Sequence, residues 1–582
     1  MTAAREITQP ASTDLPTWRI LINDQEASSE LHLMSILVSK SVNRIARAKL
    51  ELLDGDVAKE DFKLSNTDHF IPGNDIEILA GYHSDESTIF KGKITGHCLK
   101  CRQGRPSKLS IDCRDAAVLM TMGRKSAYFQ ELSDSDIIED LLNQYGLDAD
   151  IESTDVTHKE MVQYNASDWD FLLERAQANG QVVMVDDGKL AVKKPDTSLE
   201  PELSLVLGST ILEFEAEMDA RHQHQDVSSQ AWRFSDQAVV EEEGESPAFT
   251  EQGNLSGDTL AESFGQEALL LSHSGYRKDD ELKAWADAHL GRGQLAKIIG
   301  RVKCQGYGNI KPGQMLELSG VGERFNGKVY VSGISHQLDV NNWETDIQFG
   351  LAPDLLAVDN GVADAPAAGL LPPVHGLGIG VVTQLQDDPD GEDRVKVRMP
   401  IIDAADEGIW ARIASLDAGA ERGAFFRPEI DDEVVLGFLN DDPRDPVILG
   451  MFNSSAKPAP ISATDDNHEK GFVTRSQMKV IFDDDAVSIK IETPNGNTMT
   501  LSDEAGSILL EDENSNRIEM NADGISIESP GEINIAAKQD LNMDGLNVNT
   551  KADVMLKAEG SAGAELSSSA IATVKGSLVQ IN

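Results

Sequence analysis

The residues best suited to metal binding lie in one short segment, His97 to Cys101. Cys98 and Cys101 have the Cys-x-x-Cys spacing of half a zinc site, and Cys113 follows nearby. No second Cys-x-x-Cys or His-x-x-x-His completes such a site. On a strand, residues three apart also point to opposite faces. Unliganded thiols are therefore the favoured reading, and a metal site is the alternative.

Two further segments have the residue types of metal ligands. His222 and His224 are two positions apart, on one face of an expected strand, without a third ligand at an obvious spacing. Residues 387–393 resemble a calcium loop, but Gln386 and Val397 stand where an EF-hand needs acidic ligands. We interpret the first segment as an ordinary polar strand and the second as a hairpin turn.

The densest basic stretch alternates cations with valines, in the order Arg394, Val395, Lys396, Val397, Arg398. Strand geometry puts the three cations on one face. A binder of single-stranded nucleic acid would interleave aromatic stacking residues, and none interleave here. We expect a solvated strand face or a salt-bridged contact with a neighbouring subunit.

Catalytic motifs are not evident. The chain has no GxSxG, HExxH, P-loop or GxGxxG after a strand, and His468-Glu469 lacks the second histidine. No carboxylate pair for glycoside cleavage is marked out among the 99 acidic residues. The predicted site set is therefore empty: no catalytic, cofactor-binding or metal-binding residue, and no cofactor.

Charge and composition limit the partners. The 582 residues include 51 Lys+Arg against 99 Asp+Glu, a net charge of −48, which disfavours nucleic acid and anionic membranes as partners. The sequence has no run of 18 uncharged apolar residues, and Met1 to Pro16 lacks the apolar core of a signal peptide. Four cysteines do not make a disulfide scaffold. We expect synthesis in a cytoplasm.

The first 358 residues read as β-rich with a few helices. Alternation predicts strands at 18–22, 46–53, 75–78, 90–94, 109–111 and over 298–351. We expect Ser135 to cap a helix that begins before Ile137. We expect Ser167 to cap a second helix, because Asp170 follows it three residues later. A hairpin is predicted over 181–192 with its turn at 186–188, a loop or connecting arm over 237–280, and a short helix over 281–290.

A linker rich in Ala, Pro and Gly over 359–373 leads to a five-strand pattern. The candidate strands are 378–385, 394–399, 410–415, 433–439 and 447–453. Five short strands in this length fit an OB-type barrel, which we place at 374–455. Residues 456–480 are read as a connector.

The segment 481–582 repeats short aliphatic couples about every eight residues, with no aromatic residue after Phe482. Examples are Ile518/Met520, Ile525/Ile527, Ile533/Ile535, Leu541/Met543, Leu546/Val548, Val554/Leu556 and Val579/Ile581. One chain coiled this way would have a thin core. Three copies around an axis would pool the couples and pair every strand edge. The segment has 18 acidic and 6 basic residues, a net charge of −12, so disorder is the alternative interpretation.

With these motifs in view, nearly the whole chain resembles the VgrG-type spike proteins of contractile injection systems, relatives of contractile phage tail hub and spike proteins. The resemblance rests in the first half on residues 163–172 (QYNASDWDFL), on 320–327 (GVGERFNG), and on His336 and 343–345 (WET). In the barrel it rests on 393–400 (DRVKVRMP), 410–412 (WAR), 426–428 (FRP) and 441–446 (DDPRDP), and at the end of the sequence on 576–582 (GSLVQIN).

The resemblance implies a mainly β protein with minor α: tail-hub β-barrel domains with helical insertions over 17–358 behind a flexible 1–16, an OB-fold neck, and a triple-stranded β-helix needle over 481–582 formed by a homotrimer. It implies a structural, non-enzymatic spike at the tip of an inner tube, assembled in the bacterial cytoplasm into a particle that acts outside the cell. Implied partners are a PAAR-repeat tip protein, the inner tube protein, baseplate components and cargo effectors, with no nucleic acid.

Three expectations concern how this chain differs from larger members: no fused toxin, no domain between barrel and needle, and a short needle. The rival hypothesis is a trimeric tail-spike enzyme that degrades cell-wall glycan or polysaccharide, which would need a groove of Trp and Tyr beside paired carboxylates. An adhesin or receptor-binding fibre is a further alternative.

Overall fold

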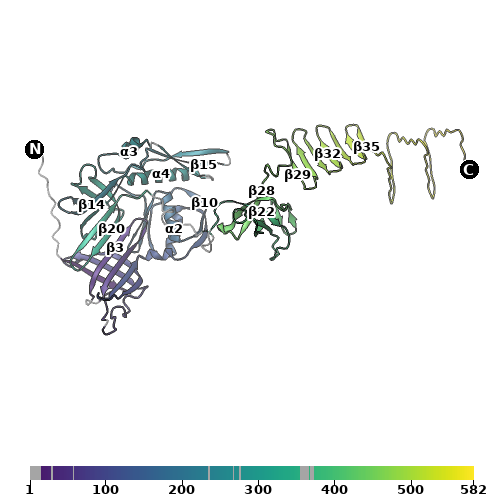
Figure 1. The fold of residues 1–582 in the computed structure, drawn as a ribbon. Helices are drawn as coiled ribbons and strands as arrows, with labels where there is room; N and C mark the ends of the chain where they lie inside the picture. The colour runs from purple at the N-terminus through teal and green to yellow at the C-terminus, as the bar shows by residue number, and fades with distance from the viewer. Residues whose placement is uncertain are drawn as a thin grey trace. The chain divides into compact units, whose positions relative to one another are not determined.

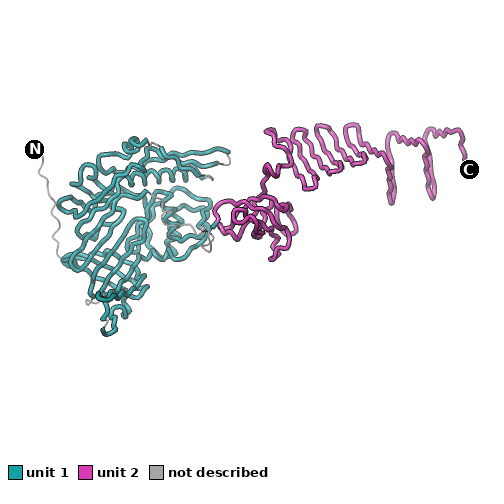
Figure 2. The backbone as a smooth tube through the Cα atoms, in the orientation of Figure 1, with its two compact units in different colours: residues 1–373 teal, residues 374–582 magenta. Residues whose placement is uncertain are grey.

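The computed structural model describes residues 15–27, 31–56, 58–233, 236–265, 268–273, 277–353, 366 and 373–581. The chain divides into two compact units, residues 1–373 and 374–582 (Figure 2). Strands dominate both units (Figure 1), as the sequence predicted. The expected flexible N-terminus and the expected linker at 359–373 fall almost wholly outside the described residues. The boundaries of the six predicted segments stay predictions.

The N-terminal unit is built on a 13-stranded sheet. One half of the sheet runs antiparallel in the order β3-β4-β7-β6-β5-β1-β2. Alternate residues of β4, such as Leu50 and Leu52, are buried in one core with Ile36, Phe90 and Ile111. Its strands are β1 (Pro16–Ile22), β2 (Gln25–Glu26), β3 (Leu33–Ser41), β4 (Arg44–Leu53), β5 (Asp75–Tyr82), β6 (Asp85–Lys100) and β7 (Lys108–Arg114).

The other half of the sheet encloses a second core that includes Val302, Leu316, Val331 and Phe349. Strand β20 joins the halves, because it pairs with β19 and β21 of this half and with β3 of the first half. The strands of this half are β13 (Pro201–Val206), β14 (Ile211–Met218), β18 (Ile298–Gln305), β19 (Met315–Ser319), β20 (Gly327–Leu338) and β21 (Trp343–Phe349).

An α/β insertion follows β7 and has its own core, with Leu142, Leu172 and Val183. Ser167 caps α2 and accepts from the Asp170 amide at 3.1 Å, as predicted. The cap of α1 is Ser133 rather than Ser135, because Ser133 and Asp136 form a reciprocal capping box. The elements are η1 (Ala116–Thr121), β8 (Lys125–Ser133), α1 (Asp134–Asn143), β9 (Asp148–Ile151), β10 (Thr157–Ala166), α2 (Asp168–Ala178), β11 (Val182–Asp186) and β12 (Lys189–Lys193).

The predicted hairpin at 181–192 is confirmed. Its turn residues Asp187 and Gly188 both have positive φ, at 56° and 88°. This conformation matches the twist of the flanking strands and suits an Asp-Gly pair.

The prediction of a loop or connecting arm at 237–280 is wrong, because this segment belongs to a second insertion with strands and a helix. Its described residues contain β16 (Ala238–Glu243), α3 (Gly257–Phe264) and β17 (Ala268–His273), and β15 (Asp226–Arg233) lies between the other two strands in one sheet. Helix α4 (Asp279–Leu295) is longer than the predicted 281–290 and packs Ala286 and Leu290 on Val227 of this sheet. The acidic, Ser-rich composition of the segment hid these elements.

The C-terminal unit begins with the predicted OB-type barrel. Its five strands close in the order β22-β23-β24-β28-β27 around Val382, Val397 and Ile448. They are β22 (Gly378–Gln384), β23 (Val395–Arg398), β24 (Ile409–Ile413), β27 (Glu433–Phe438) and β28 (Pro446–Met451), with a small hairpin of β25 (Ala418–Gly419) and β26 (Arg422–Gly423), and η3 (Leu439–Asp441) before β28.

Seven short strands then form a single antiparallel meander in which each strand pairs only with its sequence neighbours (Figure 1). They are β29 (Glu469–Val473), β30 (Lys479–Asp483), β31 (Ser488–Glu492), β32 (Thr498–Ser502), β33 (Ser507–Glu511), β34 (Arg517–Asn521) and β35 (Gly524–Glu528). Residues 529–581 are described without any strand.

Candidate functional site

One face of the C-terminal meander carries two continuous rows of apolar side chains. The pairing register puts them directly opposite one another from strand to strand. The first row is Phe472, Val480, Ile491, Met499, Leu510, Ile518 and Ile527, and the second is Phe482, Ile489, Leu501, Ile508, Met520 and Ile525. We call this surface the apolar face.

The apolar face is largely uncovered within the chain. Its exposed side chains range from 37% accessible at Ile489 to 71% at Ile525. The opposite face is polar and carries ion pairs along the strands, Lys490–Glu492 at 3.1 Å and Arg517–Glu519 at 2.7 Å. A sheet with one polar and one bare apolar face needs a second apolar layer to be stable in water.

Sequence reasoning found only the later part of this face. It identified the couples on β34 and β35 but missed those on β30 to β33, such as Ile489/Ile491 and Ile508/Leu510. The signal was present, since both couples show the same i, i+2 spacing. The predicted couples beyond Glu528, from Ile533 to Ile581, lie in residues without strand structure and are exposed.

The basic strand of the barrel behaves as the alternation predicted. Val395 and Val397 are fully buried. Lys396 forms an ion pair with Glu407 and lies 5.9 Å from the centre of the Trp410 ring. Arg394 donates to Asp388 at 2.6 Å. These two cations are therefore neutralised within the chain.

The acidic segment 387–393 lies in the connection between β22 and β23. Asp388 accepts from the backbone amides of Glu392 and Arg394, at 3.0 and 3.1 Å. The Arg394 guanidinium holds the pKa of Asp388 far below its usual range. Its carboxylate is thus used to close a turn, the role that we predicted.

The thiol candidates do not converge on a metal. Cys98 and Cys101 are exposed, whereas Cys113 is buried and burial raises the pKa of its thiol. His97 uses both ring nitrogens, Nε2 with the Ser65 hydroxyl at 2.8 Å and Nδ1 with the Phe70 carbonyl oxygen at 2.9 Å. Within the described ranges, no three His, Cys, Asp or Glu side chains are grouped so that they could hold a metal ion.

The predicted strand face at His222 and His224 is wrong, because both residues lie in the turn between β14 and β15. Burial, followed by the charges of Arg292 and the two histidines, lowers the pKa of the nearby His289. The motif residue His336 is fully buried, bonds the Thr345 hydroxyl at 3.0 Å and has its pKa lowered by burial to about 3. It is a neutral core histidine.

The motif at 163–172 also serves the fold. Asp168 is buried at the start of α2 and accepts from Gln163 at 2.8 Å, Lys125 at 2.6 Å and Tyr145 at 2.5 Å. Burial alone would raise its pKa, but these donors outweigh burial and lower it. The motif thus ties β8, β10 and α2 together.

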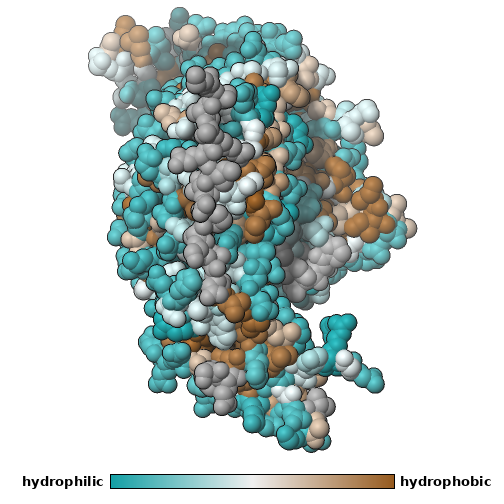
Figure 3. Space-filling model, turned by 90° about the vertical axis from the view of Figure 1, so that its left-hand side faces the viewer, coloured by the Kyte–Doolittle hydropathy of each residue, from teal (hydrophilic) through white to brown (hydrophobic). Residues whose placement is uncertain are grey.

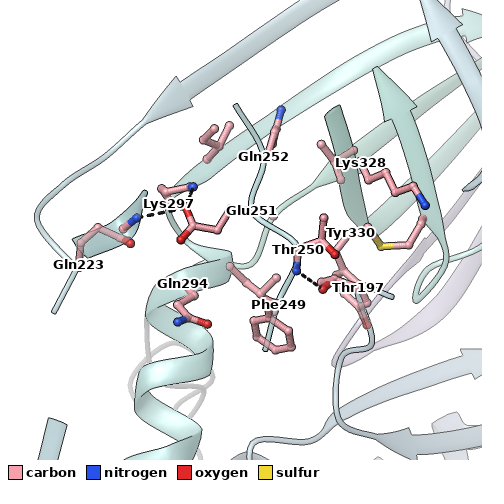
Figure 4. A pocket seen from close by; sticks show the side chains of 16 residues that line it. Thr197, Gln223, Phe249, Thr250, Glu251, Gln252, Gln294, Lys297, Lys328 and Tyr330 are labelled. Atoms are coloured by element: carbon pink, nitrogen blue, oxygen red, sulfur yellow. Dashed lines mark hydrogen bonds and ion pairs between the residues drawn. The ribbon is translucent and has the colours of Figure 1, made fainter. Parts of the chain in front are cut away.

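A small cavity lies under the second half of the sheet (Figure 4). It is lined by residues of β18, β20, α4 and the segment 249–252, and by the buried side chain of Lys297. The Lys297 ammonium pairs with Glu251 and donates to the Leu255 carbonyl at 2.8 Å. Beside it, the Thr250 amide donates to the Thr197 hydroxyl at 2.7 Å. No nucleophile paired with a base lies among its lining residues, so the cavity has the contacts of a fold-stabilising ion pair.

A second cavity comes nearest to the groove that the enzyme hypothesis requires. It combines Trp285 with two carboxylates, Asp134 and Glu281. The buried Asp134 accepts from Arg175 Nε at 2.6 Å, His158 Nε2 at 3.0 Å and Asn179 at 2.8 Å. Burial alone would raise the pKa of Asp134, but these hydrogen bonds and the Arg175 charge hold it well below its usual range. A general acid needs the opposite shift, so this arrangement suits Asp134 to a structural role.

A buried ion network was not predicted. The Lys40 ammonium on β3 lies 2.5 Å from Asp186 and 2.9 Å from Asp187, in the turn of the β11–β12 hairpin, and Lys311 also pairs with Asp186. It links the first half of the sheet, the α/β insertion and the second half. The sequence places these residues too far apart for any local pattern to reveal them.

No helix within the described residues is long and apolar enough to cross a membrane. Around the end of the molecule shown in Figure 3, hydrophilic side chains dominate, and the apolar ones form separate groups.

Three family models match the chain. Residues 12–339 match the Alg8 N-terminal domain, residues 378–452 the type VI secretion system/phage-baseplate injector OB domain, and residues 488–582 the phage baseplate V C-terminal trimerisation domain. The third match, to a trimerisation domain, covers most of the apolar face.

Among curated proteins, the type VI secretion system spike protein VgrG3 of Vibrio cholerae is 32% identical over 113 residues, 18% of this chain and 11% of that protein. The chain thus matches about a tenth of that relative's length.

Three solved structures have limited similarity to the chain. The 43 kDa tail protein of prophage MuSo2 from Shewanella oneidensis has 10% identity and a TM-score of 0.45, with 58% of this chain and 98% of that chain covered. An E. coli type VI secretion component described as similar to T4 tail proteins gp27 and gp5 has 14% identity and a TM-score of 0.37, with 74% and 99% covered. A Francisella PdpA-VgrG complex has 11% identity and a TM-score of 0.37, with 89% of this chain and 89% of that chain covered.

These TM-scores lie below 0.5, so the family assignment depends on the family models. More than half of the chain matches the first model, and an injector OB domain and a baseplate trimerisation domain follow it in order. The chain therefore belongs to the Alg8 N-terminal domain family, carries an injector OB domain and a trimerisation domain of the phage-baseplate and type VI secretion class, and is similar to VgrG-type spike proteins.

Proposed function

We propose that three copies of this chain form a non-enzymatic spike at the tip of a contractile machine's inner tube, and that the spike punctures a target envelope. In this proposal residues 17–358 form the hub, 374–455 the neck, 456–480 the connector and 481–582 the needle. The observation that carries it is the apolar face, whose two rows stay in register through β30 to β35.

A mechanical role suits the needle as an assembly. Residues 529–581 have no strand partner within the described chain and leave their aliphatic couples exposed. Neighbouring copies would supply both the missing backbone hydrogen bonds and the missing core. Unfolding one chain would then require the others to separate, which slows unfolding under load. The net −12 of residues 481–582 would limit adhesion to anionic lipid.

The proposed partners follow from this position. A PAAR-repeat protein would cap the needle, the inner tube and baseplate proteins would contact the hub, and cargo effectors would travel with the spike, whereas nucleic acid would not bind. The Francisella spike protein was solved in complex with PdpA, which supports protein partners for this chain. Assembly would take place in the bacterial cytoplasm, and the particle would act outside the cell.

The mass of the purified protein tests the assembly. Light scattering should give about 189 kDa, three times the 63.1 kDa of one chain. A monomeric mass would exclude the needle. Puncturing requires a further comparison: particles with the intact spike should permeabilise target cells, and particles with residues 529–582 removed should contract without permeabilising them.

The alternative is a spike that cleaves cell-wall glycan, and the second cavity, where Trp285 lies with the Glu281 carboxylate, is the feature that favours it. Incubation of the trimer with peptidoglycan separates the two functions. A purely mechanical spike releases no soluble sugar. Release that is lost in Glu281→Gln and retained in the matched Glu262→Gln would establish the enzyme instead.

A further inference from the structure

A third cavity of the N-terminal unit, with a volume of about 410 Å³, lies between the end of α2 and helix α4. The segment 245–249 and the residues just after β12 complete its walls. Phe249, which is labelled in Figure 4, and Leu295 line both this cavity and the one beside Lys297, so they form the partition between the two. We call it the α2–α4 cavity. We propose that it binds an indole ring, whose N–H donates to the side chain of Gln181.

Gln181 supplies an unused hydrogen-bond acceptor to the α2–α4 cavity. This residue lines the cavity and is 2% accessible, and its backbone amide donates to the Ala176 carbonyl oxygen at 2.9 Å. The side-chain Nε2 donates to the Glu152 carbonyl oxygen at 2.8 Å, which fixes Oε1 as the other end of the amide. That oxygen is buried and has no hydrogen-bond partner among the residues that the structure describes. A ligand that completes this site must therefore bring an N–H or O–H donor.

The rest of the wall selects an apolar ligand body. Its apolar residues are Val182, Pro195, Pro247, Phe249, Leu295 and Leu351. The cavity is far larger than the about 30 Å³ that one water molecule occupies in the liquid, and a buried water needs two to four polar partners. Its volume instead lies in the range of small-molecule sites, roughly 300–1,000 Å³. An aromatic ring with one donor would cover these walls and also reach Gln181.

The charges around the α2–α4 cavity balance. Two cations and two carboxylates line it, Lys194 and Arg292 against Glu245 and Asp287. With no excess of either sign, the cavity gives neither an anion nor a cation an electrostatic advantage, so a neutral ligand fits. An indole N–H only donates, whereas a phenol oxygen would need a donor of its own. Gln181 offers only an acceptor, and this favours the indole.

Hydrogen bonds hold the wall of the cavity in place without a ligand. The Glu245 amide donates to Asp287 Oδ1 at 2.5 Å. Gln294 Nε2 donates to the Ser246 hydroxyl, also at 2.5 Å. Both bonds fix the segment 245–249 on α4. A preformed site loses less conformational entropy when a ligand binds, so even a small molecule can bind with measurable affinity.

Calorimetric titration of the full-length protein tests the site with two ligands, indole and benzofuran, in which oxygen replaces the N–H of the same ring system. We expect indole to bind roughly tenfold more tightly, because benzofuran leaves Gln181 Oε1 without a donor. Ala248→Trp, at the exposed edge of the cavity, should abolish the binding of both ligands. The matched Ala238→Trp, exposed on β16 and outside the cavity, should retain it.

A variant of Gln181 isolates the hydrogen bond. Gln181→Leu should remove the preference, so that indole and benzofuran bind equally well. If this variant does not fold, the comparison of the two ligands on the unmodified protein still decides. Equal affinities there, or no binding of indole, would overturn the proposal. Neither result would bear on the trimer, because every lining residue belongs to the N-terminal unit.

The indole ring has two sources, a free small molecule and the tryptophan side chain of a partner protein. N-Acetyltryptophanamide, which carries the ring on a peptide-like backbone, separates them in the same titration. Binding with the affinity of indole would support a partner's side chain as the ligand. Binding of indole alone would support a free small molecule.

Discussion

Leu509 and Leu510 offer a matched pair of substitutions that tests which face of the meander is covered. They are neighbours on β33 and point to opposite faces: Leu510 stands opposite Met499 and Ile518 on the apolar face, and Leu509 opposite Thr500 and Glu519 on the polar face. In the single chain Leu510 is 38% accessible, and Leu509 is less exposed than that. A single-chain view therefore predicts the larger loss for Leu509.

The trimer predicts the reverse. Truncation of a leucine in a packed interior costs about 2–5 kcal/mol. Three copies of Leu510→Ala would therefore remove about 6–15 kcal/mol from one trimer, which is comparable to the whole stability of a typical domain. Leu509→Ala would stay on the surface, where a substitution changes stability by about 0.5 kcal/mol or less per chain.

The assay is the rate at which the trimer dissociates and unfolds in guanidinium, followed by light scattering and circular dichroism on the same samples. Leu510→Ala should accelerate both signals together, and Leu509→Ala should leave the rate near that of the unmodified protein. Equal rates for the two variants, or faster loss in Leu509→Ala, would refute the assignment of the apolar face to the trimer interior.

Four more outcomes follow from the N-terminal unit. Asp134→Asn should destabilise it by about 3–5 kcal/mol in urea, because Arg175 stays buried without its counter-charge; Asp140→Asn, on the same helix, is the control and should change little. The pKa of Asp134 in the folded protein is depressed, so the ionised carboxylate stabilises the fold above about pH 4, and this stabilisation is lost as the pH falls below that. The difference in unfolding free energy between the unmodified protein and Asp134→Asn should therefore narrow between pH 7 and pH 3. A constant difference would contradict an ionised carboxylate at Asp134. The native protein should react with a thiol reagent at Cys98 and Cys101 only. Cys113 and Cys304 are buried, and burial raises the pKa of Cys304 to about 12. Rapid reaction of all four thiols would be incompatible with this core. Gly188→Ala should cost about 1–2 kcal/mol, because an alanine at this left-handed φ is strained, and an unchanged melting temperature would mean that the β11–β12 turn is not rigid.

Local patterns in the sequence predicted much of the fold. Alternation found β1, β5 and all five barrel strands, and the Ser167–Asp170 spacing found the start of α2. These elements are specified by residues a few positions apart. The Asp187-Gly188 turn belongs with them, because positive φ at two adjacent positions strongly favours such a pair.

Elements whose stability comes from distant residues were missed. Strand β16 is rich in glutamate and is held by pairing with β15 and by α4 beneath it. Ser133 rather than Ser135 caps α1, since the cap depends on where β8 ends. The network around Lys40 joins residues up to 271 positions apart (311 − 40), and pairing over that distance leaves no periodic trace.

The candidate site divides in the same way. The aliphatic couples are a local signal and led to the trimer from sequence. That both apolar rows run unbroken through the meander is a matter of register, and register appears only once the hairpins are in place. Phe472 of the meander stacks on Phe426 of the barrel, and nothing in the spacing of either segment indicated this contact.

The difference between β29–β35 and residues 529–581 has a consequence for the order of assembly. The meander can form from one chain, since all its strands are joined by hairpins, and hairpin closure takes only microseconds. In the proposed trimer, the residues after Glu528 would gain strand partners only when three chains have met, an event whose rate depends on concentration. A shift of one residue between chains would turn every aliphatic couple outward. In the proposed trimer, the meanders would therefore associate first and fix the register between the chains, and the remaining residues would then pair in one direction, starting from Glu528.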